Sequence, residues 1–380
     1  MHSLLFKILR RTVLALLGLF LVLEAVLWLF VRTPVEPLKR LDLSNSIPGL
    51  KKEVRVTFDR HVARYLDDKN GSKPPGTVRI LCLGGSGTLS MLQNAEDTWW
   101  GQLGRMLQKQ GLKVEVAAWG QEKAGIVAST PVAGQLMEEW RPDLVIGNFG
   151  FDDVVSQPVK YTYRPDKARR LPPAAQSSGW KQAVLTVSQT ARLGRLWSRN
   201  NEAAVLQNQL GRPDRYREVF ENVKKSIAKS PFVNPPARPY DNDPLKEYLD
   251  GWKILESLAK RHGATLVMTG EAALDSASLT EQQAENLLAW STVEGGVPSK
   301  QTVPFRPSPV WVEQEMERYA AAARDLASEL KVTWFNLNGT VPRDPDHFFS
   351  DVQLTDKGAA AAAGELLPVI EPFLRARGGP

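Results

Sequence analysis

The sequence predicts an α/β protein, a three-layer sandwich with a parallel sheet, preceded by one N-terminal transmembrane helix. First, apolar runs suited to buried strands alternate with segments of helical periodicity over residues 78–149, and again over 244–374. Second, the run at 78–83 ends in Gly84 and Gly85, directly before Ser86. Third, an almost unbroken apolar stretch at 13–31 is long enough to cross a bilayer.

The N-terminal stretch is interpreted as an uncleaved signal anchor. Lys7, Arg10 and Arg11 precede it, and no small-x-small cleavage site follows it. A short basic N-terminus before a single anchor most often stays inside, so the main domain is expected on the periplasmic side of a bacterial inner membrane. The expected segments are a cytoplasmic N-terminus at 1–11, a transmembrane span at 12–32, a proline-rich linker at 33–75 and a main domain at 76–380.

The amino-acid composition limits the disulfides, metal sites and partners that the chain can have. The chain has 380 residues, a formal net charge of +6 and a single cysteine, Cys82, so it has no intrachain disulfide and no cysteine metal cluster. No spacing of His, Asp or Glu favours a metal, and no cofactor is expected. The modest positive charge suits a membrane surface or an acidic glycan. Nucleic acid is disfavoured because no binding motif accompanies the charge.

The first half of the main domain forms consecutive strand–helix units. Leu103, Met106 and Leu107 recur at helical spacing, and Gly111 is placed to end that helix. Part of the linker, at 54–65, is expected to be a strand or short helix packed on the domain. The expected elements are a strand at 78–83, a helix at 99–110, a strand at 114–118, a helix at 132–140 and a strand at 144–149.

Two insertions interrupt the second half. Residues 160–244 are rich in proline and arginine, with a helix expected at 181–199 whose arginines either touch an anionic surface or form a solvated face. Residues 270–309 are polar and resemble a lid over the sheet edge. Between and after the insertions we expect a helix at 244–262, a strand at 265–269, a helix at 311–330, a strand at 332–337 and a helix at 356–374, N-capped by Thr355.

Ser86 is the centre of the candidate site. Its turn lies at the carboxyl end of a strand, where open α/β sheets bind their ligands. Gly84 and Gly85 permit close approach, and a helix starting near the serine directs backbone N–H groups at negative charge.

Several blocks together resemble the SGNH, or GDSL-type, hydrolase family, specifically its membrane-anchored bacterial members. The blocks are Gly84-Gly85-Ser86, Gly150-Phe151-Asp152-Asp153, Leu354-Thr355-Asp356-Lys357-Gly358 and the phrase Arg141-Pro142-Asp143 before the third strand. The resemblance covers residues 78–374 and implies a flavodoxin-like fold, with Ser86 as nucleophile. It also implies an oxyanion or substrate site at Gly120 or Gly125, with Gly150 and Asp152.

Three family positions depart from the pattern. Gln353 stands at the histidine position, Ser350 at the aspartate position and Asp152 at the asparagine position. Glutamine cannot take the proton of a serine, and an ionised aspartate repels an oxyanion where an amide would donate to it.

An upstream Asp-x-x-His offers another base. In this reading His347 deprotonates Ser86 and is oriented by Asp344 or Asp351.

Two functions therefore remain open. One is a serine esterase or O-acyltransferase that acts on O-acyl groups, acetyl among them, of an acylated envelope polysaccharide. The other is a non-catalytic pseudoenzyme that binds a glycan or a protein within an envelope complex of other membrane subunits.

Overall fold

The computed structural model describes residues 39–42, 55–58, 63–67, 73–90, 93–120, 125–155, 232–233, 243–280, 283, 293–295 and 303–378. The expected anchor at 12–32 and the arginine-bearing helix at 181–199 lie outside these residues. Across the described part of the chain, none of the helices has the length and apolar character needed to cross a membrane.

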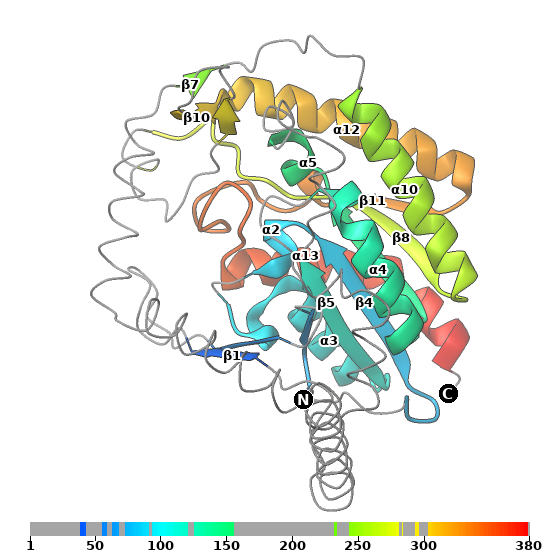
Figure 1. The fold of residues 1–380 in the computed structure, drawn as a ribbon. Coiled ribbons are helices and arrows are strands. Elements are labelled where there is room, and N and C mark those ends of the chain that lie inside the picture. The colour runs from blue at the N-terminus through cyan, green and yellow to red at the C-terminus, as the bar shows by residue number, and fades with distance from the viewer. Residues whose placement is uncertain are drawn as a thin grey trace, which may run out of the picture.

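A six-stranded sheet forms the middle of the domain (Figure 1), and its strands run in the order β11-β8-β6-β4-β5-β3. All neighbours are parallel except β3, which pairs antiparallel with β5 at one edge. The predicted α/β class and parallel sheet are confirmed. The strands are β3 (Ala63–Tyr65), β4 (Val78–Gly84), β5 (Val114–Gly120), β6 (Leu144–Phe149), β8 (Thr265–Gly270) and β11 (Thr333–Asn336).

Helices cover both faces of the sheet, which gives three layers (Figure 1). Alternate residues of β4 separate two apolar cores: Leu81 and Leu83 belong to one, Ile80 and Cys82 to the other. The first core contains residues of α4 (Ile126–Trp140), α10 (Pro244–Arg261) and α12 (Pro309–Leu330). The second contains residues of α3 (Trp99–Lys109) and α13 (Asp356–Gly378).

Shorter elements complete the described chain. The antiparallel pair is β1 (Lys39–Asp42) and β2 (Arg55–Phe58), and a separate three-stranded sheet joins β7 (Phe232–Val233), β10 (Val303–Pro307) and β9 (Val293–Gly295). The last two of these strands lie within the range expected as a lid. The short helices are α2 (Ser86–Leu89), η1 (Ala95–Asp97), α5 (Phe151–Val155) and η3 (Leu337–Gly339).

The helix expected at 132–140 begins earlier, at Ile126, because Pro131 does not end it. Proline has no N–H for the carbonyl four residues back, which here belongs to Val127. The hydroxyl of Thr130 donates to that carbonyl instead, at 3.1 Å. Two expected helix boundaries are confirmed. Gly111 follows α3 with a φ of 85°, and the Thr355 hydroxyl accepts from the Gly358 N–H at the start of α13.

Residues from the range expected as a linker, 33–75, also form a strand of the sheet. Strand β3 pairs Ala63 with Trp119 and Tyr65 with Ala117. The short apolar run that contains it does not reveal which sheet edge it joins, because that pairing depends on residues far along the chain.

Candidate active site

Ser86 and Asp152 follow two neighbouring strands at the carboxyl edge of the sheet. Ser86 is the first residue of α2, directly after β4, and Asp152 lies in α5, directly after β6. The chain leaves β4 toward the α3 face and leaves β6 toward the α10 face (Figure 1). The two residues therefore lie at the point where the strand order reverses, which is where such sheets place their sites.

The two side chains are hydrogen-bonded to each other. Oδ2 of Asp152 accepts from the Oγ–H of Ser86 at 2.8 Å and from the Ser86 backbone N–H at 2.6 Å. Ser86 is half-buried, whereas Asp152 is only 2% exposed. The expected serine and the expected block residue are thus brought together. The backbone N–H of Ser86 thus donates to a carboxylate oxygen.

Three further carboxyls surround this pair. Burial raises the pKa of Asp152 to about 7; its hydrogen bonds from Ser86 lower the value, and the nearby Asp153 and Asp351 raise it. Glu271 follows β8 and accepts from the Phe151 N–H at 3.0 Å. Burial, and then the charge of Asp152, raise the pKa of Glu271 well above its ordinary value. Asp152 and Glu271 therefore both resist ionisation.

Asp153 and Gly125 meet at the start of α4. Oδ1 of Asp153 accepts from the Ile126 N–H at 2.8 Å, and a Cβ on Gly125 would collide with the same oxygen. A carboxylate at a helix N-terminus is stabilised by the helix dipole. Asp153 therefore acts as a cap for α4, and Gly125 is needed for its close approach.

The other glycines expected at the site differ in their surroundings. A Cβ on Gly120 would lie 2.5 Å from Leu89 N and 2.7 Å from the Gly85 carbonyl, so the end of β5 packs directly on the Ser86 turn. Gly150 has a φ of 151° and turns the chain from β6 into α5. The oxyanion role of Gly120, Gly125 and Gly150 stays a prediction.

His347 and Asp344 form a second pair. Nδ1 of His347 lies 2.7 Å from Oδ1 of Asp344, and this bond lowers the pKa of the Asp344 carboxyl. The His347 carbonyl accepts from the Thr355 N–H and packs against Gly358 at the start of α13. Among the described residues, no hydrogen bond joins His347 to Ser86.

The loop after His347 reaches the serine through its tip. Phe348 and Leu354 bridge across its base, and Ser350 Oγ accepts from the Gln353 N–H at 3.1 Å. A Cβ on Gly87 would lie 3.0 Å from the carbonyl of Val352, so the tip packs beside the turn. Ser350 therefore shapes the loop, in the place where the family pattern expects an aspartate.

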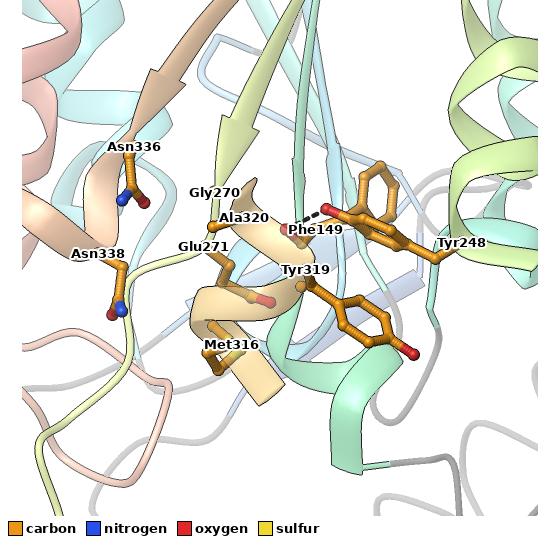
Figure 2. Close-up of a pocket in the computed structure, with 10 residues that line it drawn as sticks. Phe149, Tyr248, Gly270, Glu271, Met316, Tyr319, Ala320, Asn336 and Asn338 are labelled. Carbon is orange, nitrogen blue, oxygen red and sulfur yellow. Dashed lines mark hydrogen bonds between the residues drawn. The ribbon is translucent and has the colours of Figure 1, made fainter. Parts of the chain in front are cut away.

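A small pocket lies behind the site, at the ends of β6 and β8 (Figure 2). The view shows the Glu271 carboxyl between Met316 and Tyr319, with Asn336 and Asn338 at the other side. Tyr248 donates to the Phe149 carbonyl at 3.5 Å. The pocket holds about one water molecule, so it is too small for an acyl group. In the described part of the chain, no set of three or more His, Cys, Asp or Glu has the arrangement of a metal site.

Sequence reasoning missed two residues, Arg64 and Glu271. Arg64 is buried in β3 and donates to the carbonyls of Leu89, Ser90 and Gln93, at 2.6, 2.7 and 2.7 Å. It fixes the end of the short helix that Ser86 begins. No local pattern marks this role. Glu271 could have been found, because it directly follows an expected strand at the ligand edge.

Comparison with known proteins identifies structural neighbours only. No family profile and no curated protein match the chain. The structural neighbours are SGNH/GDSL-type esterases and lipases that align over up to 78% of the chain. One is TesA, with a TM-score of 0.41, 9% identity and 99% of its chain covered. Another is a carbohydrate acetylesterase family member from Sinorhizobium meliloti, with a TM-score of 0.40, 14% identity, 78% of this chain and 99% of that chain covered. A third is the M. smegmatis aryl esterase, with a TM-score of 0.39, 13% identity and the same two shares.

Proposed function

We propose that the chain is a serine ester hydrolase or O-acyltransferase in which Ser86 attacks the ester carbonyl. The hydrogen bond from Ser86 Oγ to Asp152, at 2.8 Å, carries this proposal. A half-buried serine at a strand-to-helix turn, with a proton acceptor within reach, is the arrangement a nucleophile needs. Gly120, at the end of the adjoining strand, lets the β5 backbone pack directly against the Ser86 turn.

The proposed substrates are O-acyl groups, acetyl among them, on an envelope glycan. The proposal places the domain in the periplasm, held by the span at 12–32 to the inner membrane of a bacterium. Support comes from the apolar stretch and its basic flank, and from the resemblance of the residue blocks to membrane-anchored SGNH members. The net charge of +6 favours an acidic polymer or lipid surface nearby.

One observation favours the second function, a non-catalytic binding subunit. The Ser86 N–H donates to Asp152 and not to an open oxyanion site, and an ionised carboxylate there repels a developing oxyanion. In that case the sheet edge at Ser86 binds an acylated glycan or a membrane partner without turning it over.

Turnover by the full-length chain in mild detergent separates the two functions. We expect p-nitrophenyl acetate and acetylated glycans to be hydrolysed by the wild type and not by Ser86→Ala. The conservative control Ser328→Ala, at a site on α12 away from the sheet edge, keeps wild-type turnover. A wild-type rate equal to that of Ser86→Ala rejects catalysis, and retained binding of the acetylated glycan then supports the subunit function.

A further inference from the structure

We propose that Asp152 is the general base that takes the proton of Ser86. This inference rests on the proposed ester chemistry and assigns its missing base. It gives Asp152 a different role from the oxyanion or substrate contact that the residue blocks lead us to expect.

The geometry supports direct proton transfer. The distance from Ser86 Oγ to Asp152 Oδ2, 2.8 Å, lies within the range of about 2.6–3.2 Å that a general base requires. The same oxygen is fixed by the Ser86 backbone N–H at 2.6 Å. The carboxylate is therefore oriented by the backbone of the residue that it would deprotonate.

The surroundings give the carboxyl enough basicity. An ordinary aspartate, with a pKa of about 3.9, is a weak base at neutral pH. Here burial raises the pKa of Asp152 to about 7, close to the value of an unperturbed histidine. The titratable groups that face it are Asp153 on α5, Asp351 in the loop before α13 and Glu271 after β8. All three are carboxyls; the charges of Asp153 and Asp351 oppose the loss of the Asp152 proton, and the charge of Asp152 raises the pKa of Glu271.

His347, the alternative base, makes no hydrogen bond to Ser86 among the described residues. The ring of His347 is bonded to Asp344, and its backbone packs at the start of α13. The loop between His347 and the serine turn places Val352 beside Gly87. Asp152, by contrast, accepts the Ser86 hydroxyl proton at 2.8 Å.

The reaction balances in two halves. In the first, Ser86 Oγ bonds to the acyl carbon while its proton moves to Asp152; the carbon–oxygen bond to the alcohol then breaks, and Asp152 returns the proton to the leaving oxygen. In the second, water or an acceptor hydroxyl attacks the acyl-serine and gives its proton to Asp152. The serine–acyl bond breaks, and Asp152 returns that proton to Ser86 Oγ. No oxidant, metal or cofactor enters the balance.

The substitution Asp152→Asn distinguishes the two roles by the sign of its effect. If Asp152 is the base, the amide cannot take the proton, and Ser86-dependent turnover falls by about 10²–10⁴-fold. If the position serves the oxyanion, the amide supplies a donor and turnover rises, which overturns the inference. Asp325→Asn, on the exposed side of α12, is the matched control and keeps wild-type turnover.

Two further measurements keep the test decisive. The wild-type rate should rise with pH through about 7, and this limb should remain in His347→Gln. Its midpoint should be nearly independent of temperature, because carboxyl ionisation has little heat, whereas imidazolium ionisation absorbs a substantial amount. A midpoint that falls steeply on warming, or loss of the limb in His347→Gln, overturns the assignment to Asp152.

Chemical rescue covers the case in which Asp152→Asn folds poorly. Asp152→Ala, confirmed as folded by its thermal transition, should regain turnover in sodium formate, which supplies a carboxylate. Ser86-dependent turnover that persists in Asp152→Ala without formate overturns the inference alone. Absence of Ser86-dependent turnover in the wild type overturns the proposed ester chemistry together with it.

Discussion

Gly85 lies so close to Asp152 that a side chain at position 85 would occupy the space of the carboxylate. A Cβ built there would collide with Oδ2, the oxygen that binds Ser86, and would come within 2.9 Å of Cγ. The second glycine of the turn is therefore required by a residue more than sixty positions away. A glycine is needed at position 85 because the Asp152 carboxylate approaches the backbone closely, and not because of φ, since a value of −89° is accessible to any residue.

The substitution Gly85→Ala should accordingly displace Asp152 from Ser86. We expect Ser86-dependent ester turnover to fall by at least about 10²-fold, because a displacement of about 1 Å at a reacting group has that effect. Steady-state kinetics on p-nitrophenyl acetate measure the loss. Gly364→Ala is the control: nothing lies within 4 Å of its Cβ position in α13, so activity should be retained. Equal turnover in Gly85→Ala and the wild type would contradict the predicted displacement.

The Asp152 carboxyl should also make stability depend on pH. Burial raises its pKa from the ordinary value of 3.8 to about 7 on folding, so the folded state binds its proton more tightly than the unfolded state does. The stabilisation is complete below about pH 4 and is lost as pH rises through about 7. Between about pH 4 and 7 the free energy of unfolding should fall by a few kcal/mol more in the wild type than in Asp152→Asn, and the difference should level off above about pH 8. Curves of unfolding free energy against pH that run parallel for the wild type and Asp152→Asn would disprove this prediction.

The charge of Asp351 should affect the pKa of the Asp152 carboxyl. Its charge raises the pKa of Asp152, so Asp351→Asn should lower that pKa. The rising limb of the pH–rate profile should then move to lower pH, with the plateau rate retained. A limb that stays in place or moves to higher pH would show that Asp351 does not act on the group that titrates.

Arg64 should stabilise the nucleophile turn. Its guanidinium donates to three backbone carbonyls and lies 5.4 Å from the Trp100 ring centre. Arg64→Met leaves those carbonyls without their donor, which we expect to cost about 3 kcal/mol or more of unfolding free energy. Urea unfolding measures the cost. Arg105→Met removes an exposed ion pair with Asp67 and should cost less than about 1 kcal/mol. Similar losses in the two variants would refute the role of Arg64.

Much of the architecture follows from local patterns. The glycines that end β4 and the helical spacing of Leu103 and Leu107 are read from short windows, and the sheet and its helices appear where these predict. The edge strand β3 is different. Its three residues, Ala63–Tyr65, are identified as a strand only by their pairing with β5, which lies some fifty residues later.

The site divides in the same way. Ser86 can be found from its turn, and Asp152 from its place after β6, because both signals are local. The hydrogen bond between Ser86 and Asp152 cannot be predicted from local patterns, because it depends on the register of β4 against β6. The raised pKa of Asp152 comes first from burial, and the charge of Asp351, almost two hundred residues away in the chain, adds to it. Burial and long-range charge are properties of the folded molecule.

The edge strand also sets the shortest version of the domain that can be expressed with an intact serine turn. A fragment that starts at residue 76, just before β4, keeps all five parallel strands but lacks Arg64. Such a fragment leaves the carbonyls of Leu89, Ser90 and Gln93 without their donor and exposes the outer edge of β5. Fragments for crystallisation or screening should therefore begin before residue 63.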